Sequence, residues 1–353
     1  MAVYILLFAL VIFIATNYSN NNKMGYLALF VLFFISAFRG ENVGTDTLHY
    51  LEIEDLSYRI ENASYNIWAR PEFIYVYFVQ YFLEHDISLR FLLIFFSFII
   101  VLFLWLTANR MKYSIPVMSL IFLLYFYLYS FNISRQIASI SVLLYGYTFL
   151  IDMDKSKRKY FLLCVILAML LHASSFLAII LWFIVPLKIN RTVSLSVISI
   201  LFLFNSVGPI PILQTFFEMM SSNFYSIKYG DDTSLFEKSL IGLATDFMNV
   251  ASLLAAFLLQ SKGTKTTPKD NLYLLGIIVT ILTGNINSNV ARISLCFSIF
   301  NVIYLTELFQ KRMIKVSVNI LFWFIVLFNS FFRLYDAAQG NGQIVPYYFS
   351  FNF

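Results

Sequence analysis

The chain has 353 residues, of which 60% are hydrophobic and 12% are charged, and its formal net charge is +5. A soluble globular domain carries about 25% charged residues, so this composition excludes that class and predicts an integral membrane protein. The long apolar runs lack the strict alternation of a transmembrane barrel, so the spans are expected to be helices. The positive charge does not indicate nucleic-acid binding, because most basic residues lie in short loops and follow the positive-inside rule.

Apolar segments of roughly the length that crosses a bilayer follow one another along the chain, about twelve in all. They predict an all-α, polytopic protein with a single transmembrane domain, residues 1–353. The first segment has neither a basic leader nor a small-residue cleavage site, so we expect a span and not a removed signal peptide. In chain order the segments cover residues 2–16, 24–38, 89–108, 114–132, 137–151, 160–171, 174–187, 193–205, 240–260, 272–284, 290–309 and 316–332.

The loops between these segments alternate in charge. Those that follow the odd-numbered segments are basic, among them NYSNNNK, DMDKSKRK and SKGTKTTPKD, which orients them toward the cytoplasm. The opposite face carries few lysines but these arginines: Arg39, Arg59, Arg70, Arg90, Arg135, Arg292 and Arg333. A planar guanidinium binds phosphate or carboxylate with a matched pair of donors. The distribution therefore predicts a site for an anionic, lipid-borne substrate on the outer face, where both termini are also expected.

Two long loops are predicted on the outer face, at residues 39–88 and 206–239. The first is acidic and contains the aromatic, amphipathic stretch PEFIYVYFVQYFLEH. We expect this stretch to lie in the membrane interface as a helix with Pro71 in its first turn. Loops of this length are often functional.

Two polar motifs precede helices on this predicted face. In FRGENVGTDTLHY, Arg39, Asp46 and His49 are candidates to line a polar cavity, and the alternative is a capped loop with no further role. In SRQIAS, the donors of Arg135 and Gln136 favour an anion site, and the alternative is an arginine that anchors the helix at the membrane surface.

Two further motifs lie later in the chain. LAMLLHASSF contains His172, which can accept a proton near neutral pH; the alternative is a hydrogen-bonded group at a helix end. GNINSNVARIS gathers Asn289 and Arg292 in a polar cluster that suits a hydroxyl-rich sugar. The tail GQIVPYYFSFNF ends in aromatics that are expected at the membrane interface.

The order of these motifs resembles that of the EpsG and Wzy-type polysaccharide polymerases. The shared pattern is an early GTD followed by His-Tyr, then SRQ-x-A, then A-x-x-L-H-x-S-S, a late arginine and a terminal Pro-Tyr, and it extends over nearly the whole chain. The residues that carry it are Gly44, Thr45, Asp46, Tyr50, Arg135, Gln136, Ala138, His172 and Ser174. The resemblance implies a fold similar to the membrane glycosyltransferase C superfamily and a place in the bacterial cytoplasmic (inner) membrane.

The resemblance also implies a reaction. Such enzymes join oligosaccharide repeat units carried on undecaprenyl pyrophosphate, with the active site facing the periplasm or exterior. On this reading His172 is the general base, with Asp46 second. Arg135 and Arg292 bind the pyrophosphate, with Arg39 as a third candidate. The remaining residues assigned to substrate binding are His49, Tyr50, Gln136 and Asn289.

The expected partners are the lipid-linked glycan and membrane lipid, together with a chain-length regulator and a flippase. No nucleic acid and no cofactor are expected. A histidine cluster is missing from the sequence, and no metal is predicted. Two alternatives stay open. One is a flippase or transporter, although the charges cluster at helix ends and not at the midplane. The other is an O-antigen ligase that uses the same donor.

Overall fold

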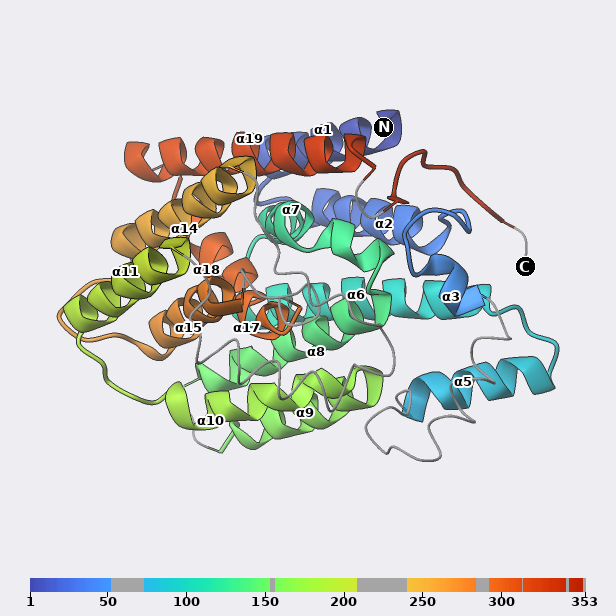
Figure 1. The fold of residues 1–353 in the computed structure, drawn as a ribbon, viewed down its shortest axis with the longest axis horizontal. Helices are drawn as coiled ribbons and strands as arrows, with labels where there is room; N and C mark the ends of the chain where they lie inside the picture. Colours follow the sequence, from blue (N-terminus) through green and yellow to red (C-terminus); the bar gives the residue numbers. More distant parts are fainter. Residues whose placement is uncertain are drawn as a thin grey trace. The chain divides into compact units, whose positions relative to one another are not determined.

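The computed structural model describes residues 1–51, 73–152, 156–207, 240–283, 292–312, 314–340 and 343–351. The elements in these ranges are helices (Figure 1), and strand-like pairing within them is confined to two isolated bridges. The all-α prediction is therefore confirmed. The helices fall into two compact units, which are described one at a time.

The first unit comprises Met1–Glu61, Pro71–Phe176 and Leu305–Phe353. Its core is made of large apolar side chains, and Phe96, Phe122 and Phe161 are all fully buried. Its helices are α1 (Ala2–Asn17), α2 (Asn22–Ala37), α3 (Thr47–Leu51), α5 (Phe73–Glu84), α6 (Arg90–Met111), α7 (Ile115–Tyr125), the 3₁₀ helix η3 (Tyr127–Phe131), α8 (Ser134–Leu150), α9 (Lys159–Leu171) and α19 (Val316–Ala338).

Local sequence signals set the ends of several of these helices. The side chain of Asn21 accepts hydrogen bonds from the backbone N–H groups at the start of α2. The hydroxyl of Ser114 accepts from the Val117 N–H, and Pro116 occupies the first turn of α7. Lys112 ends α6 in a left-handed conformation, at φ 56°. These short-range signals fix the starts of α2 and α7 and the end of α6.

The second unit comprises Asn62–Arg70 and Leu177–Tyr304. Within it Asp270 is buried. Its carboxylate accepts from the Thr267 N–H at 2.9 Å and from the Tyr304 hydroxyl at 2.9 Å, and its own N–H donates to Thr267 Oγ1. This reciprocal pair is a capping box at the start of α15. The helices are α10 (Leu181–Ile184), α11 (Arg191–Val207), α14 (Leu240–Gln260), α15 (Pro268–Thr283) and α17 (Ser294–Ser298), while η4 (Ala173–Ile180) and α18 (Asn301–Phe309) contain the unit boundaries.

Three segments predicted as single helices each divide into two elements. Two of these pairs still form one continuous apolar helix each, Ala173–Ile184 and Ser294–Phe309, so the prediction was wrong only for segment 114–132. Segment 114–132 divides into α7 and η3, and segment 174–187 into η4 and α10. The described part of segment 290–309 divides into α17 and α18. After α7 the break has a local cause, because Ser130 Oγ donates to the Tyr127 carbonyl and Ser134 Oγ donates to the Ser130 carbonyl. Such side-chain bonds compete with the helical ladder.

Two described helices, α6 and α19, are long and apolar enough to cross a membrane. The other apolar helices found by the same criteria, including α1, α2 and α9, are shorter than 18 residues. The number of spans and the single domain over residues 1–353 stay predictions. The amphipathic stretch does form a helix, α5, but its place in the interface stays a prediction, and Pro71 lies outside the described residues.

Candidate functional site

Arg39, directly after the end of α2, is fully buried, with 0% of its surface exposed. Its Nε donates to Thr47 Oγ1 at 3.0 Å, and its Nη1 donates to the Ser36 carbonyl at 2.8 Å. Its Nη2 donates to Ser134 Oγ at 2.8 Å and to the Phe131 carbonyl at 3.4 Å. The guanidinium thus ties the loop between α2 and α3 to the junction of η3 and α8.

The charge of Arg39 is buried but well compensated. Burial lowers the pKa of Arg39 from its ordinary value to about 10, so the guanidinium is still protonated near neutral pH. A buried charge is tolerated when its donors are engaged, and four protein acceptors engage them here. These contacts favour a role in positioning the loop. Substrate binding by Arg39 stays a prediction.

The GTD motif docks against the start of α8. Gly44 has a positive φ of 96°, and a Cβ at this position would lie 2.3 Å from the Phe131 carbonyl oxygen, so only glycine fits without strain. The next residue, Thr45, donates its N–H to Asn132 Oδ1 at 2.9 Å. Asp46 is half-buried directly before α3. The motif therefore brings Asp46 to the end of α8 where Arg135 lies.

Arg135 is half-buried in the first turn of α8 and lies against two tyrosines. Its guanidinium carbon is 4.3 Å from the ring centroid of Tyr75 on α5 and 5.7 Å from that of Tyr50 on α3. The two rings are 6.0 Å apart and nearly perpendicular. Cation–π contacts of this kind hold a guanidinium in place while keeping its charge. The neighbouring Gln136 is buried.

The SRQIAS and LHASS motifs lie side by side because α8 packs against α9 (Figure 1). Ser139, one helical turn after Arg135, donates to the Ala168 carbonyl at 2.7 Å and shares a short hydrogen bond with Ser175. His172 is half-buried and lies just past the end of α9, between Ala168 and Ser175 in the sequence. Its backbone N–H also donates to the Ala168 carbonyl. The structure therefore places Arg135 and His172 at the same end of the helix pair.

The C-terminal tail completes this end of the unit. Gly40 donates its N–H to the Tyr348 carbonyl at 2.8 Å, and Ser350 donates its N–H to the Phe38 carbonyl at 3.0 Å. The Tyr348 hydroxyl accepts from the Asn42 N–H at 2.9 Å. A Cβ on Gly40 would lie 2.0 Å from the Tyr348 ring, so the tail requires glycine here. The sequence predicted an interfacial tail and missed this pairing.

Arg90 is a further buried residue that sequence reasoning missed. It is 2% exposed, and its Nη1 donates to the carbonyls of Arg39, at 3.0 Å, and Ser350, at 3.2 Å. Its Nη2 forms an ion pair with Glu41 at 3.5 Å. An arginine at the start of an apolar helix looks like a surface anchor, so its sequence position alone carries no signal of this role. A cavity of about 300 Å³ lies beside this ion pair and is bordered by Leu51.

Arg333 on α19 stabilises the end of α7. Its Nε donates to the Leu124 carbonyl at 3.1 Å and its Nη2 to the Tyr125 carbonyl at 3.3 Å. Its Nη1 donates to the Tyr129 hydroxyl at 3.1 Å. Leu124 and Tyr125 are the last two residues of α7, and carbonyls at a helix end take partners from outside the helix. The contacts assign Arg333 a structural role in the first unit.

The described structure does not relate the remaining candidates to this group of residues. Arg292 belongs to the second unit, where it is half-buried, and its carbonyl accepts from the Leu295 N–H at 3.2 Å, beside α17. Asn289 lies outside the described residues, and for His49 only the backbone, on α3, is described. Their roles stay predictions.

Across the described ranges, no three His, Cys, Asp or Glu side chains gather closely enough to hold a metal ion. No curated protein and no solved structure matches the chain. A family model does match, that of the EpsG family, and it extends over residues 22–349. The match includes the GTD loop, the SRQIAS and LHASS motifs and most of the tail. The chain therefore belongs to the EpsG family.

Proposed function

We propose that this protein is a polysaccharide polymerase that joins repeat units carried on undecaprenyl pyrophosphate at the outer face of the bacterial cytoplasmic membrane. The EpsG family is associated with exopolysaccharide biosynthesis. The observation that carries the proposal is the cluster formed by Arg135, its two tyrosines, His172 and Asp46 at one end of the first unit.

The two ends of the first unit differ in a way that supports this location. Arg90 and Arg110 lie at opposite ends of α6, about 30 Å apart at 1.5 Å per residue. Beside Arg90 is the candidate site. Beside Arg110 are Asp152, at 3.0 Å, and the basic loop after α8 that includes Lys157. Lysine-rich loops favour the cytoplasmic side, which leaves the candidate site on the outer side.

The proposed chemistry uses each group of the cluster once. A hydroxyl of the incoming lipid-linked unit attacks the anomeric carbon of the growing chain, and the bond from that carbon to the pyrophosphate oxygen breaks. Undecaprenyl pyrophosphate leaves with its negative charge, which Arg135 stabilises. His172 accepts the hydroxyl proton, with Asp46 as the second candidate. The longer glycan then remains on the carrier of the incoming unit.

Reconstitution tests the proposal directly. Purified protein in liposomes, supplied with lipid-linked repeat units, should produce a ladder of longer glycans. One undecaprenyl pyrophosphate should be released for each new linkage. Excess chelator should leave the rate unchanged.

Three other results would point elsewhere. Movement of lipid-linked units across the bilayer without new glycosidic bonds would identify a flippase. Transfer of a finished glycan only to a different acceptor lipid would identify a ligase. Loss of activity in chelator would refute metal independence while leaving the polymerase assignment intact.

A further inference from the structure

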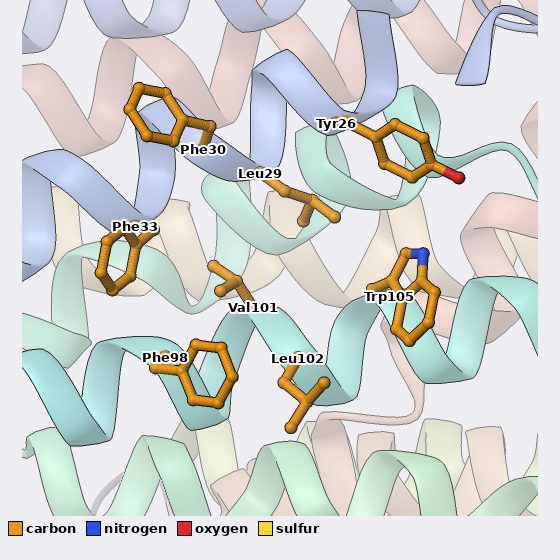
Figure 2. A pocket seen from close by; sticks show the side chains of 8 residues that line it. All are labelled: Tyr26, Leu29, Phe30, Phe33, Phe98, Val101, Leu102 and Trp105. Atoms are coloured by element: carbon orange, nitrogen blue, oxygen red, sulfur yellow. The ribbon is translucent and has the colours of Figure 1, made fainter. Parts of the chain in front are cut away.

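An apolar groove runs along the first unit between α2 and α6. Its volume is about 430 Å³, and the side chains that line it carry no formal charge. Figure 2 shows Tyr26 of α2 facing Trp105 of α6 at one end, and Phe33 facing Phe98 at the other. The lining residues run from Tyr26 to Phe33 on α2 and from Phe98 to Trp105 on α6, so the groove is an open hollow along the facing middle parts of two antiparallel helices.

Two aromatic side chains of the groove are exposed. Phe30 is 59% exposed and Phe98 is 51% exposed. Next to Phe98, the Ser97 hydroxyl donates to the Ser36 hydroxyl at 2.8 Å, so the two helices are held together at this end. Large apolar side chains exposed together along a fixed channel indicate that an apolar partner covers them.

The groove continues as an aromatic track toward the candidate site. The rings of Phe30 and Phe34 are 6.0 Å apart, and that of Phe34 lies 5.5 Å from Phe349 in the tail. The rings of Phe38 and Phe351 are likewise 5.5 Å apart. From Tyr26 to Phe38 the track follows 12 residues of α2 and its end, roughly 18 Å at 1.5 Å per residue.

The track ends at the buried arginines of the site. Phe349 forms an isolated bridge with Arg39, and the carbonyl of Ser350 accepts from Arg90. An apolar path thus begins between α2 and α6 and finishes where the GTD loop is anchored. A surface that only contacts bulk lipid does not need to connect with the hydrogen bonds of Arg39 and Arg90 that anchor the GTD loop.

We propose that the groove and the aromatic track hold the polyprenyl chain of the lipid-linked substrate. This inference rests on the proposed function, because that function supplies a polyprenyl carrier. The chain lies along α2 and α6 with its pyrophosphate end toward the GTD loop. A long, methyl-branched hydrocarbon fits an open, apolar groove lined by aromatic and aliphatic side chains, and its position along α2 and α6 sets where the attached glycan emerges.

Photo-crosslinking of the full-length protein in liposomes tests this assignment. The probe is a polyprenyl phosphate with a diazirine in its chain, and mass spectrometry maps the labelled peptides. Labelling should concentrate on the peptides of α2 and α6. Unlabelled polyprenyl phosphate should reduce it at least tenfold, whereas dioleoyl phosphatidylglycerol should not. Equal competition by both lipids, or labelling spread over all exposed apolar helices, would overturn the proposal.

A matched pair of variants sharpens the test. Leu102→Trp places a large ring in the groove, and Leu163→Trp makes the same change on α9, where Leu163 is 54% exposed. We expect at least a tenfold loss of labelling, and a similar rise in KM for the lipid-linked unit, in Leu102→Trp alone. Equal behaviour of the two variants would overturn the proposal. The wild-type labelling map decides the matter even if Leu102→Trp does not fold.

The two proposals fail in different ways. Labelling requires no turnover, so specific labelling of α2 and α6 without polymerisation would refute the polymerase and keep the groove. Polymerisation with labelling elsewhere would refute the groove and keep the polymerase.

Discussion

Replacing Arg39 by lysine should destabilise the first unit, because the fork of donors that holds the GTD loop is removed while the positive charge is kept. In the structure the guanidinium serves acceptors on three sides: Thr47 Oγ1, the Ser36 carbonyl and Ser134 Oγ, all within 3.0 Å. An ammonium group at the end of a flexible stem has no planar fork and cannot reach all three positions.

The magnitude follows from the hydrogen bonds that lysine cannot make. A hydrogen bond to a charged group contributes about 1.5–3 kcal/mol. Removal of two of the three short bonds therefore costs about 3–6 kcal/mol. At roughly 2–4 °C per kcal/mol for a domain of this size, the apparent melting temperature should fall by about 6 °C or more.

The assay is thermal unfolding of the purified protein in detergent, measured together with polymer formation. Arg110→Lys is the control, because Arg110 is 25% exposed and makes a surface ion pair with Asp152. Such pairs contribute about 0–1 kcal/mol.

The stability contributed by Arg39 should not depend on pH near neutrality, because burial lowers the pKa of Arg39 only to about 10. The folded protein thus holds this proton less tightly than the unfolded chain, and the resulting gain in stability with pH begins only above about 10. The melting temperature of the wild type should show no Arg39-dependent change near neutral pH.

One result would refute this reasoning about Arg39. If Arg39→Lys melts within about 2 °C of the wild type, the fork is not holding the loop. If it also loses polymer formation, Arg39 acts on the substrate, as the sequence predicted, and not on the fold.

Three further predictions concern the site and the tail. His172→Gln should lower the rate about 10²–10⁴-fold, as expected for loss of a general base. If His172→Gln has normal activity and Asp46→Asn is inactive, Asp46 is the general base. Tyr75→Leu removes the closer cation–π contact of Arg135. Because such a contact contributes roughly 0.5–2 kcal/mol, this variant should lower kcat/KM about 2- to 30-fold, while Tyr75→Phe should retain activity. Unchanged kcat/KM in Tyr75→Leu would show that this contact does not contribute to activity. Gly40→Ala should displace the tail, because its Cβ would lie 2.0 Å from a tail ring; limited proteolysis should then release the tail faster, and an unchanged cleavage rate would contradict the pairing.

The sequence predicted the parts of the site that depend on helix order. Asp46, Arg135 and His172 were expected on one face, and the structure places all three at one end of the first unit. Loop charge and motif spacing suffice for this, because consecutive antiparallel helices return the chain to the same side.

The contacts between distant segments could not be predicted in this way. The tail meets the GTD loop through backbone hydrogen bonds between Gly40 and Tyr348, and side-chain periodicity does not report backbone pairing. Arg90 donates to two carbonyls, which every residue carries, so these partners leave no mark in the sequence. Arg39 divides its bonds between carbonyls and the hydroxyls of Thr47 and Ser134, and hydroxyl residues are too common along the chain to identify the pair. The break after α7 also depends on tertiary contacts, since Arg333 satisfies the carbonyls it exposes.

The most direct test of the central claim compares Arg135→Ala with Arg110→Ala in reconstituted liposomes. Both changes remove one guanidinium from the first unit, one at each end. If Arg135 makes two charged hydrogen bonds to the leaving pyrophosphate, its removal costs about 3–6 kcal/mol, or about 10²–10⁴ in rate. We predict that Arg135→Ala abolishes the polymer ladder at normal protein level, while Arg110→Ala stays within about threefold of the wild type. Full activity in Arg135→Ala, or an equal loss in both variants, would contradict the assignment of the active site to this end of the molecule.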